Sequence, residues 1–111
     1  MASQWKIPLS DEETCFWTAH GAGCCHLSPC WGLHVVDGRV EFLGVGQDHA
    51  TPVFLAKFVR DDPAQPWHGY PVHQKRVPDR PRREVLNVWL QQGTLRKAAI
   101  RKIMQGHPCT P

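Results

Sequence analysis

The chain has 111 residues, a length that suits one domain with a single hydrophobic core and excludes two independent cores. Apolar residues make up 41% and charged residues 21%, and five Trp and four Phe supply enough large apolar surface to exclude wholesale disorder. The formal charge of +3 is unevenly divided: residues 1–73 carry four Lys or Arg against eight Asp or Glu, and residues 74–111 carry nine against two, which favours an anionic partner.

No stretch reaches the roughly 18 apolar residues that a membrane span requires, and the N-terminus lacks a signal-peptide pattern. We therefore expect a cytoplasmic protein with no membrane partner. A reducing cytosol keeps cysteines as thiols, and a disulfide framework is the weaker interpretation because an odd number leaves one thiol unpaired. The five cysteines are Cys15, Cys24, Cys25, Cys30 and Cys109.

Residues 1–30 form the first segment of this single domain and are rich in Cys and His. They show neither alternation of apolar residues nor a sustained helical period. Ser10 and the three acids after it could cap one helical turn. The segment is therefore predicted to be rich in loops.

Residues 31–59 predict a small antiparallel meander of three strands. The runs 31–36 and 39–45 flank Asp37 and Gly38, a pair that accepts the positive φ angles of a type I′ hairpin turn. The third run, 52–59, is apolar at both alternating positions, which is typical of a strand covered on both faces.

Residues 60–80 contain four Pro and one Gly, so they predict an ordered loop held by Trp67, Tyr70 and Val72. Beyond this loop the apolar spacing predicts helices at about 81–92 and 95–105, with Asp79 as the first cap and Gly93 and Gly106 after the helix ends. The expected fold is thus α+β, a meander packed with a basic C-terminal αα-hairpin over 81–106.

The Cys/His-rich segment offers one possible metal site. Two short-range pairs, His20 with Cys24 and Cys30 with His34, have residue types that bind Zn²⁺ tetrahedrally. Only five residues separate the pairs, fewer than in zinc fingers, and no CxxC occurs. A zinc-stabilised interaction domain is therefore an alternative, thiols with incidental histidines are the simpler interpretation, and no other cofactor is expected.

A second group of candidate residues lies in the Pro-rich loop. His68 and His73 could act as general base and acid, with Tyr70 and Lys75 beside them to stabilise a phosphate, as in a small metal-independent ribonuclease. Asp48 and its neighbour His49 could join such a site. The simpler interpretation is that the aromatic residues anchor the loop and the histidines face solvent.

The basic tail supports the leading hypothesis, a non-enzymatic binding module for an anionic macromolecule, either a nucleic acid or an acidic protein surface. Phosphates reward such a surface through counterion release, and Arg suits bidentate phosphate contacts. No segment resembles a named family, so every expectation rests on the residues themselves. The predicted partner-binding residues are Arg82, Arg83, Lys97, Arg101 and Lys102.

Overall fold

The computed structural model describes residues 3–25 and 28–111 and confirms a mixed α+β class. Within these residues three α-helices accompany two antiparallel sheets. The larger sheet has the order β3-β2-β6-β7 and consists of β2 (Cys30–Val36), β3 (Arg39–Glu41), β6 (Leu55–Val59) and β7 (His68–Val72). The smaller sheet has the order β1-β4-β5 and consists of β1 (Gln4–Trp5), β4 (Gly44–Val45) and β5 (Pro52–Val53).

The hairpin between β2 and β3 forms as the sequence predicts. Asp37 and Gly38 have φ angles of 52° and 78°, the left-handed pair that a type I′ turn needs. The run 52–59 is covered on both faces as expected, because every residue from Val53 to Phe58 is buried. These two features place an apolar layer on each side of the central strands.

The predicted meander is wrong in its strand order. Run 39–45 breaks into β3 and β4, and run 52–59 breaks into β5 and β6, so the second and third predicted strands each serve both sheets. As a result β6 pairs with β2, for example Ala56 opposite Gly32, while β5 pairs with β4. A backbone hydrogen bond of 2.9 Å from the Leu43 N–H to the Val53 carbonyl joins the strands near the bend.

The loop-rich prediction for residues 1–30 is also wrong, because α1 spans Leu9–Gly21. The helix begins after Pro8 with no side-chain cap, and it buries Cys15 and Ala19. Gly32 on β2 permits this packing: a Cβ atom there would lie 2.7 Å from the Cys15 carbonyl oxygen. Close approach of two backbones therefore holds α1 against the sheet.

The segment 60–80 is more regular than predicted, since it contains β7 and a 3-10 turn at Val77–Asp79. Asp79 does not cap a helix. Its carboxylate is buried and accepts from the Lys57 ammonium at 3.1 Å, and its carbonyl accepts from the Trp31 indole at 3.0 Å. The buried ion pair ties the turn after β7 to the central strand β6.

The C-terminal helices are shorter than predicted: α2 spans Arg83–Gln91 and α3 spans Lys97–Gln105. Their N-caps are Arg82 and Arg96, neither of which makes a side-chain capping bond. The glycine stops are confirmed, because Gly93 and Gly106 have φ angles of 72° and 74°.

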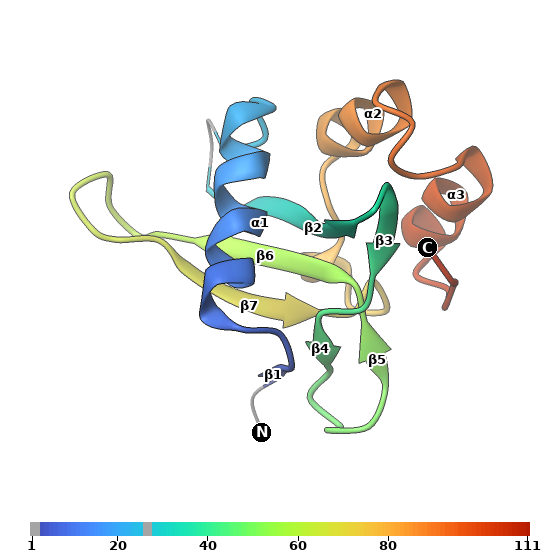
Figure 1. Cartoon of the computed structure of the whole chain (residues 1–111), viewed down its shortest axis with the longest axis horizontal. Coiled ribbons are helices and arrows are strands. Elements are labelled where there is room, and N and C mark those ends of the chain that lie inside the picture. Colours follow the sequence, from blue (N-terminus) through green and yellow to red (C-terminus); the bar gives the residue numbers. More distant parts are fainter. Residues whose placement is uncertain (1–2, 26–27) are drawn as a thin grey trace.

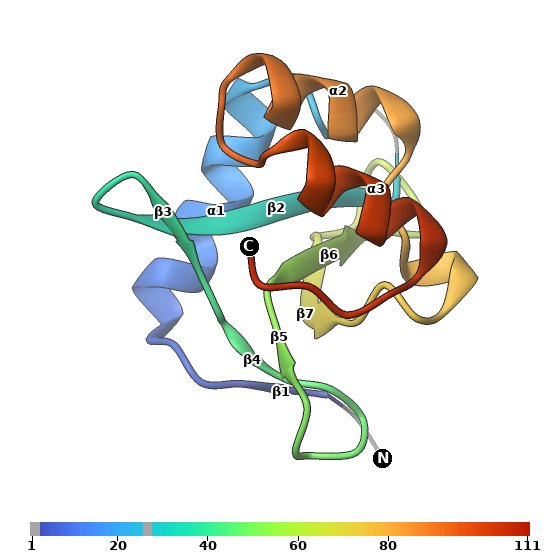
Figure 2. The same ribbon diagram turned by 90° about the vertical axis from the view of Figure 1, so that its right-hand side faces the viewer.

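Figures 1 and 2 show that α1 lies across one side of the larger sheet, whereas α2 and α3 lie on the side away from it. In Figure 1 the smaller sheet lies below the larger one, on the side of the molecule where the chain begins. No helix formed by residues 3–25 and 28–111 has the length and apolar character that crossing a membrane requires.

Candidate functional site

A cleft of about 420 Å³ lies where the end of β7 meets the connector between β4 and β5. It brings Asp48 on the connector together with Tyr70, His73 and Lys75, as the sequence analysis considered, whereas His49 is not in its lining. Other polar side chains in its lining are Thr51, Arg76 and Asp79. The cleft thus combines a neutral imidazole, a phenol, two cations and two carboxylates in one place.

His73 is the half-buried imidazole of this cleft. Its Nδ1 accepts a hydrogen bond of 2.9 Å from the backbone N–H of Lys75, so the neutral ring carries its proton on Nε2. Burial lowers the pKa of His73, the nearby Lys75 charge lowers it further, and Asp48 opposes both. The ring is therefore neutral at pH 7 and offers an N–H donor.

Asp48 shapes the connector that forms one wall. Its carboxylate accepts the backbone N–H groups of Ala50 and Thr51, each at 2.9 Å, and also the Thr51 hydroxyl. These hydrogen bonds, led by that of the hydroxyl, lower the pKa of Asp48 to about 2. Asp48 stays ionised at physiological pH, and its oxygens are occupied in holding the turn.

Lys75 and Arg76 provide the positive charge of the cleft. Both are exposed, and the carboxylate nearest Arg76, that of Asp79 at 3.8 Å, is already paired with Lys57. The Arg80 guanidinium donates to the carbonyls of Gln74 and Lys75, which fixes the turn that carries these cations. The positive charge is therefore presented on a preformed loop.

His68 does not belong to this cleft. It lies at the opposite end of β7, where it pairs with Val59 and is exposed. The strand rises about 3.3 Å per residue, so roughly 13 Å separates His68 from Val72, which lines the cleft. The predicted pair of His68 and His73 therefore does not converge on one phosphate.

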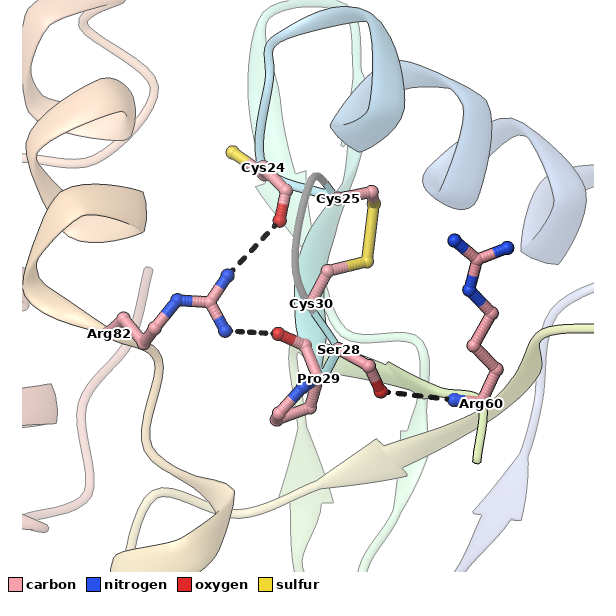
Figure 3. Close-up of a disulfide and its surroundings, with 7 residues drawn as sticks. All are labelled: Cys24, Cys25, Ser28, Pro29, Cys30, Arg60 and Arg82. Atoms are coloured by element: carbon pink, nitrogen blue, oxygen red, sulfur yellow. Dashed lines mark hydrogen bonds between the residues drawn. A yellow bond between two sulfur atoms is a disulfide. The ribbon is translucent and has the colours of Figure 1, made fainter. Parts of the chain in front are cut away.

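The predicted zinc ligands are not assembled either. Cys30 forms a disulfide with Cys25, so the expectation that all five cysteines are thiols is wrong for this pair (Figure 3). Cys24 is a buried thiol, His20 is exposed on α1, and His34 lies on β2. Residues 3–25 and 28–111 contain no group of three or more Cys, His, Asp or Glu that could hold a metal ion. His26, in the same segment, lies outside the described residues.

Arg82, a predicted partner-binding residue, has its guanidinium engaged inside the molecule. It donates to the carbonyls of Pro29 and Cys24 and pairs with Glu84 at 2.8 Å (Figure 3). Because Arg82 is half-buried and bonded to these carbonyls, it links the start of α2 to the loop that the disulfide closes. The sequence could not indicate this role, because the two residues whose carbonyls accept from Arg82 lie more than fifty positions away.

The other four predicted partner-binding residues are exposed. Arg83 lies in the first turn of α2, and Lys97, Arg101 and Lys102 lie on α3. In the described part of the chain, no ion pair involves any of these four side chains. Lys102 also lines a second cleft of about 360 Å³, which shares Thr51, His73 and Pro108 with the first.

We call the exposed cations Lys75, Arg76, Lys97, Arg101 and Lys102 the basic surface: the first two line the first cleft, Lys102 lines the second, and Lys97 and Arg101 lie on the same helix as Lys102. Cations of this kind can bind anions, and His73 lines both clefts. Comparison of the chain with models of protein families, with characterised proteins and with solved structures finds no match, so this geometry alone supports a function.

Proposed function

We propose that the protein is a binding module that holds the phosphate backbone of a nucleic acid on its basic surface. The observation that carries this proposal is that no ion pair among the described residues uses the cations of α3. The sequence after Glu84 contains no acid, and the described residues form no ion pair with Lys97, Arg101 or Lys102. Cations without internal partners are available to phosphates.

The position of the charge on α3 supports the same proposal. Arg96 is the N-cap and Lys97 the first helical residue, at the end of the helix where the macrodipole is positive. Cations at that end lower helix stability. A local energetic benefit therefore does not explain Arg96 or Lys97, whereas an external anion does.

The test is a binding titration of single-stranded and duplex oligonucleotides at roughly 50 and 200 mM salt, read by fluorescence anisotropy. Arg101→Glu with Lys102→Glu should weaken binding by about tenfold or more, and wild-type affinity should fall steeply with salt. The matched control reverses Lys6 and Arg39, two exposed cations outside the basic surface, and changes the net charge equally.

This control distinguishes binding at the basic surface from nonspecific attraction by the net charge of the protein. Equal losses in both double variants would show that net charge alone is responsible. Polyglutamate serves as a second probe: if the wild type binds it but no oligonucleotide, the partner is an acidic protein and the nucleic-acid proposal fails. Circular dichroism checks that each variant is folded.

A second candidate function is phosphoryl transfer at His73, and the convergence of His73, Tyr70 and Lys75 on one cleft favours it. The Nε2–H of His73 would donate to a phosphate oxygen, and the cations would stabilise the charge of the phosphate in the transition state. RNA turnover in EDTA tests it: His73→Ala should abolish turnover and His68→Ala should leave it intact. Negligible turnover by the wild type would eliminate this candidate.

A further inference from the structure

A groove of about 370 Å³ lies on the other side of the molecule, between α1, β1 and the adjoining ends of β6 and β7. We call it the aromatic groove because five rings line it. They are Trp5, Phe16, Trp17, Phe58 and Trp67. These rings come from four separate segments of the chain, so the fold, and no local motif, assembles them.

The floor of the groove depends on Gly69 of β7. A Cβ atom at Gly69 would lie 2.5 Å from the Phe58 ring, so glycine lets that ring lie directly against the strand; the Trp5 ring, at 3.5 Å from the same point, is at ordinary contact distance. The Trp5 indole N–H also donates to the Gly69 carbonyl at 3.3 Å. Two aromatic side chains are thereby fixed on the backbone of β7.

The wall of the groove is held by ring contacts. Phe16 on α1 packs edge-on against Phe58, with centroids 5.2 Å apart, and lies 5.5 Å from Trp67. Trp17 stands next to Phe16 at 5.1 Å and remains 64% exposed at the mouth. The rings are therefore preformed, and an indole is left in water at the opening.

The charged residues lining the groove are both acidic, Glu12 and Glu13 of α1. Negative ring faces and carboxylates together attract a cation. The protein already contains one example of this attraction nearby, because the guanidinium carbon of Arg60 lies 4.5 Å from the centre of the Trp67 ring. Arg60 itself does not line the groove.

We propose that the aromatic groove binds a small quaternary ammonium compound. A quaternary group carries no N–H donor, so its methyl groups can pack against the five rings while the carboxylates of Glu12 and Glu13 balance its charge. The volume lies in the range of small-molecule sites. The ligand is cationic, so this site is independent of the basic surface.

Isothermal titration calorimetry compares choline with 3,3-dimethylbutanol, the neutral analogue in which carbon replaces the charged nitrogen. Choline should bind at least roughly fivefold more tightly than the analogue, because ring faces and carboxylates attract only the charged form. Trp17→Ala and Glu12→Gln should each weaken choline binding severalfold. Matched controls are Phe42→Ala and Glu41→Gln, which alter an exposed ring and an exposed acid outside the groove.

Each outcome is decisive. Equal or tighter binding of the neutral analogue would make the groove a hydrophobic surface and overturn the proposal, as would no binding of choline by the folded protein. A trimethyllysine peptide is the third ligand: if it binds and choline does not, the groove serves a modified protein and the small-ligand assignment fails. Loss in the control variants equal to loss in Trp17→Ala would also contradict the proposal.

Discussion

The first and last helices of the protein are stabilised in opposite ways. α1 has Asp11 and Glu12 in its first turn, where acids interact favourably with the helix dipole, yet the side chains that it fully buries are only those of Cys15 and Ala19. α3 has cations in place of acids at its start, yet it buries Ala99, Ile100 and Ile103. Interactions of acids with the helix dipole stabilise α1, whereas the burial of apolar side chains stabilises α3.

This difference shows how charge becomes available for function. Apolar burial far outweighs a surface charge in free energy, so a helix that buries branched side chains tolerates unfavourable cations at its start. The helix with little buried volume needs other supports, which here are the close approach at Gly32 and the disulfide that follows it. The predictions below test these two modes of stabilisation.

The largest expected effect is in α3. Ile103 is completely buried, so Ile103→Ala should lower the free energy of unfolding by about 2–5 kcal/mol. Urea denaturation measures this loss. Met104, the next residue, is 45% exposed, and Met104→Ala should cost well under half as much. Similar losses at both positions would show that α3 is not held by its buried face.

The second effect concerns the disulfide between Cys25 and Cys30, which closes a loop with a sequence separation of five. Reduction should lower the free energy of unfolding by about 2 kcal/mol through the entropy of the unfolded chain. Urea denaturation with and without reductant measures it, and a Cys25→Ser, Cys30→Ser variant should not respond to reductant.

Thiol counting gives an independent check of the same bond. The oxidised protein, once denatured, should react with alkylating reagent at Cys15, Cys24 and Cys109 alone, and at all five cysteines after reduction. Reaction of all five without reductant would contradict the disulfide. Cytoplasmic localisation, from which the free thiols were expected, stays a prediction.

The elements that sequence reasoning identified are those with regular apolar spacing. Val85, Leu86 and Trp89 repeat at helical intervals, and all three are buried in α2. α1 has no such stripe, because its buried Cys15 and Ala19 are small and its large Trp17 points to solvent. The periodicity of apolar residues therefore identifies a helix that buries large side chains. It misses a helix that packs through small residues and close contact between backbones.

β7 was missed for a different reason. Pro71 and Gly69 made the segment read as a loop, yet β7 is an edge strand, paired on one side only with β6. An edge strand tolerates proline because the missing N–H need not join a second neighbour. Whether the proline is tolerated therefore depends on the strand order. The strand order in turn depends on the bends between β3 and β4 and between β5 and β6, which no local pattern predicted.

The candidate sites, too, could be predicted from local sequence only in part. Both halves of the cleft, Asp48 and the segment with His73, could be identified because each is local in the sequence. Their meeting was a possibility in the sequence that the fold decides, and the assembly of Trp5 with Trp67 in the aromatic groove was not predictable without the sheet register. The five Trp were a signal of unusual aromatic content, but composition does not indicate which of them remain at a surface.

A separate effect is confined to alkaline pH and concerns α1 alone, because Cys15 lies in that helix. Burial raises the pKa of the Cys15 thiol to about 12, with the Asp11 and Glu12 charges adding to it. The unfolded thiol ionises first, so stability should fall as pH rises above the ordinary thiol pKa of about 8.5, by about 1.4 kcal/mol for each pH unit until about 12.

Cys15→Ala provides the comparison for this effect, because it removes the thiol and keeps a small apolar side chain in α1. The wild type should lose more stability than the variant between neutral and alkaline pH, as measured by urea denaturation at each pH. Parallel curves would show that Cys15 ionises as easily in the folded protein as in the unfolded one.

The smallest expected effect is an increase in the free energy of unfolding, and it compares the two helices most directly. Lys97→Glu gives α3 the acidic first turn that α1 already has, and should raise the free energy of unfolding by about 0.3–1 kcal/mol. Lys102→Glu places an acid in the last turn, where the dipole is negative, and should lower stability by a similar amount. If both substitutions weaken oligonucleotide binding while their effects on stability differ in sign, the loss of binding cannot come from unfolding. Such a pair would identify the charge of Lys97 as serving a partner at the cost of helix stability, and equal stability changes would remove the dipole argument.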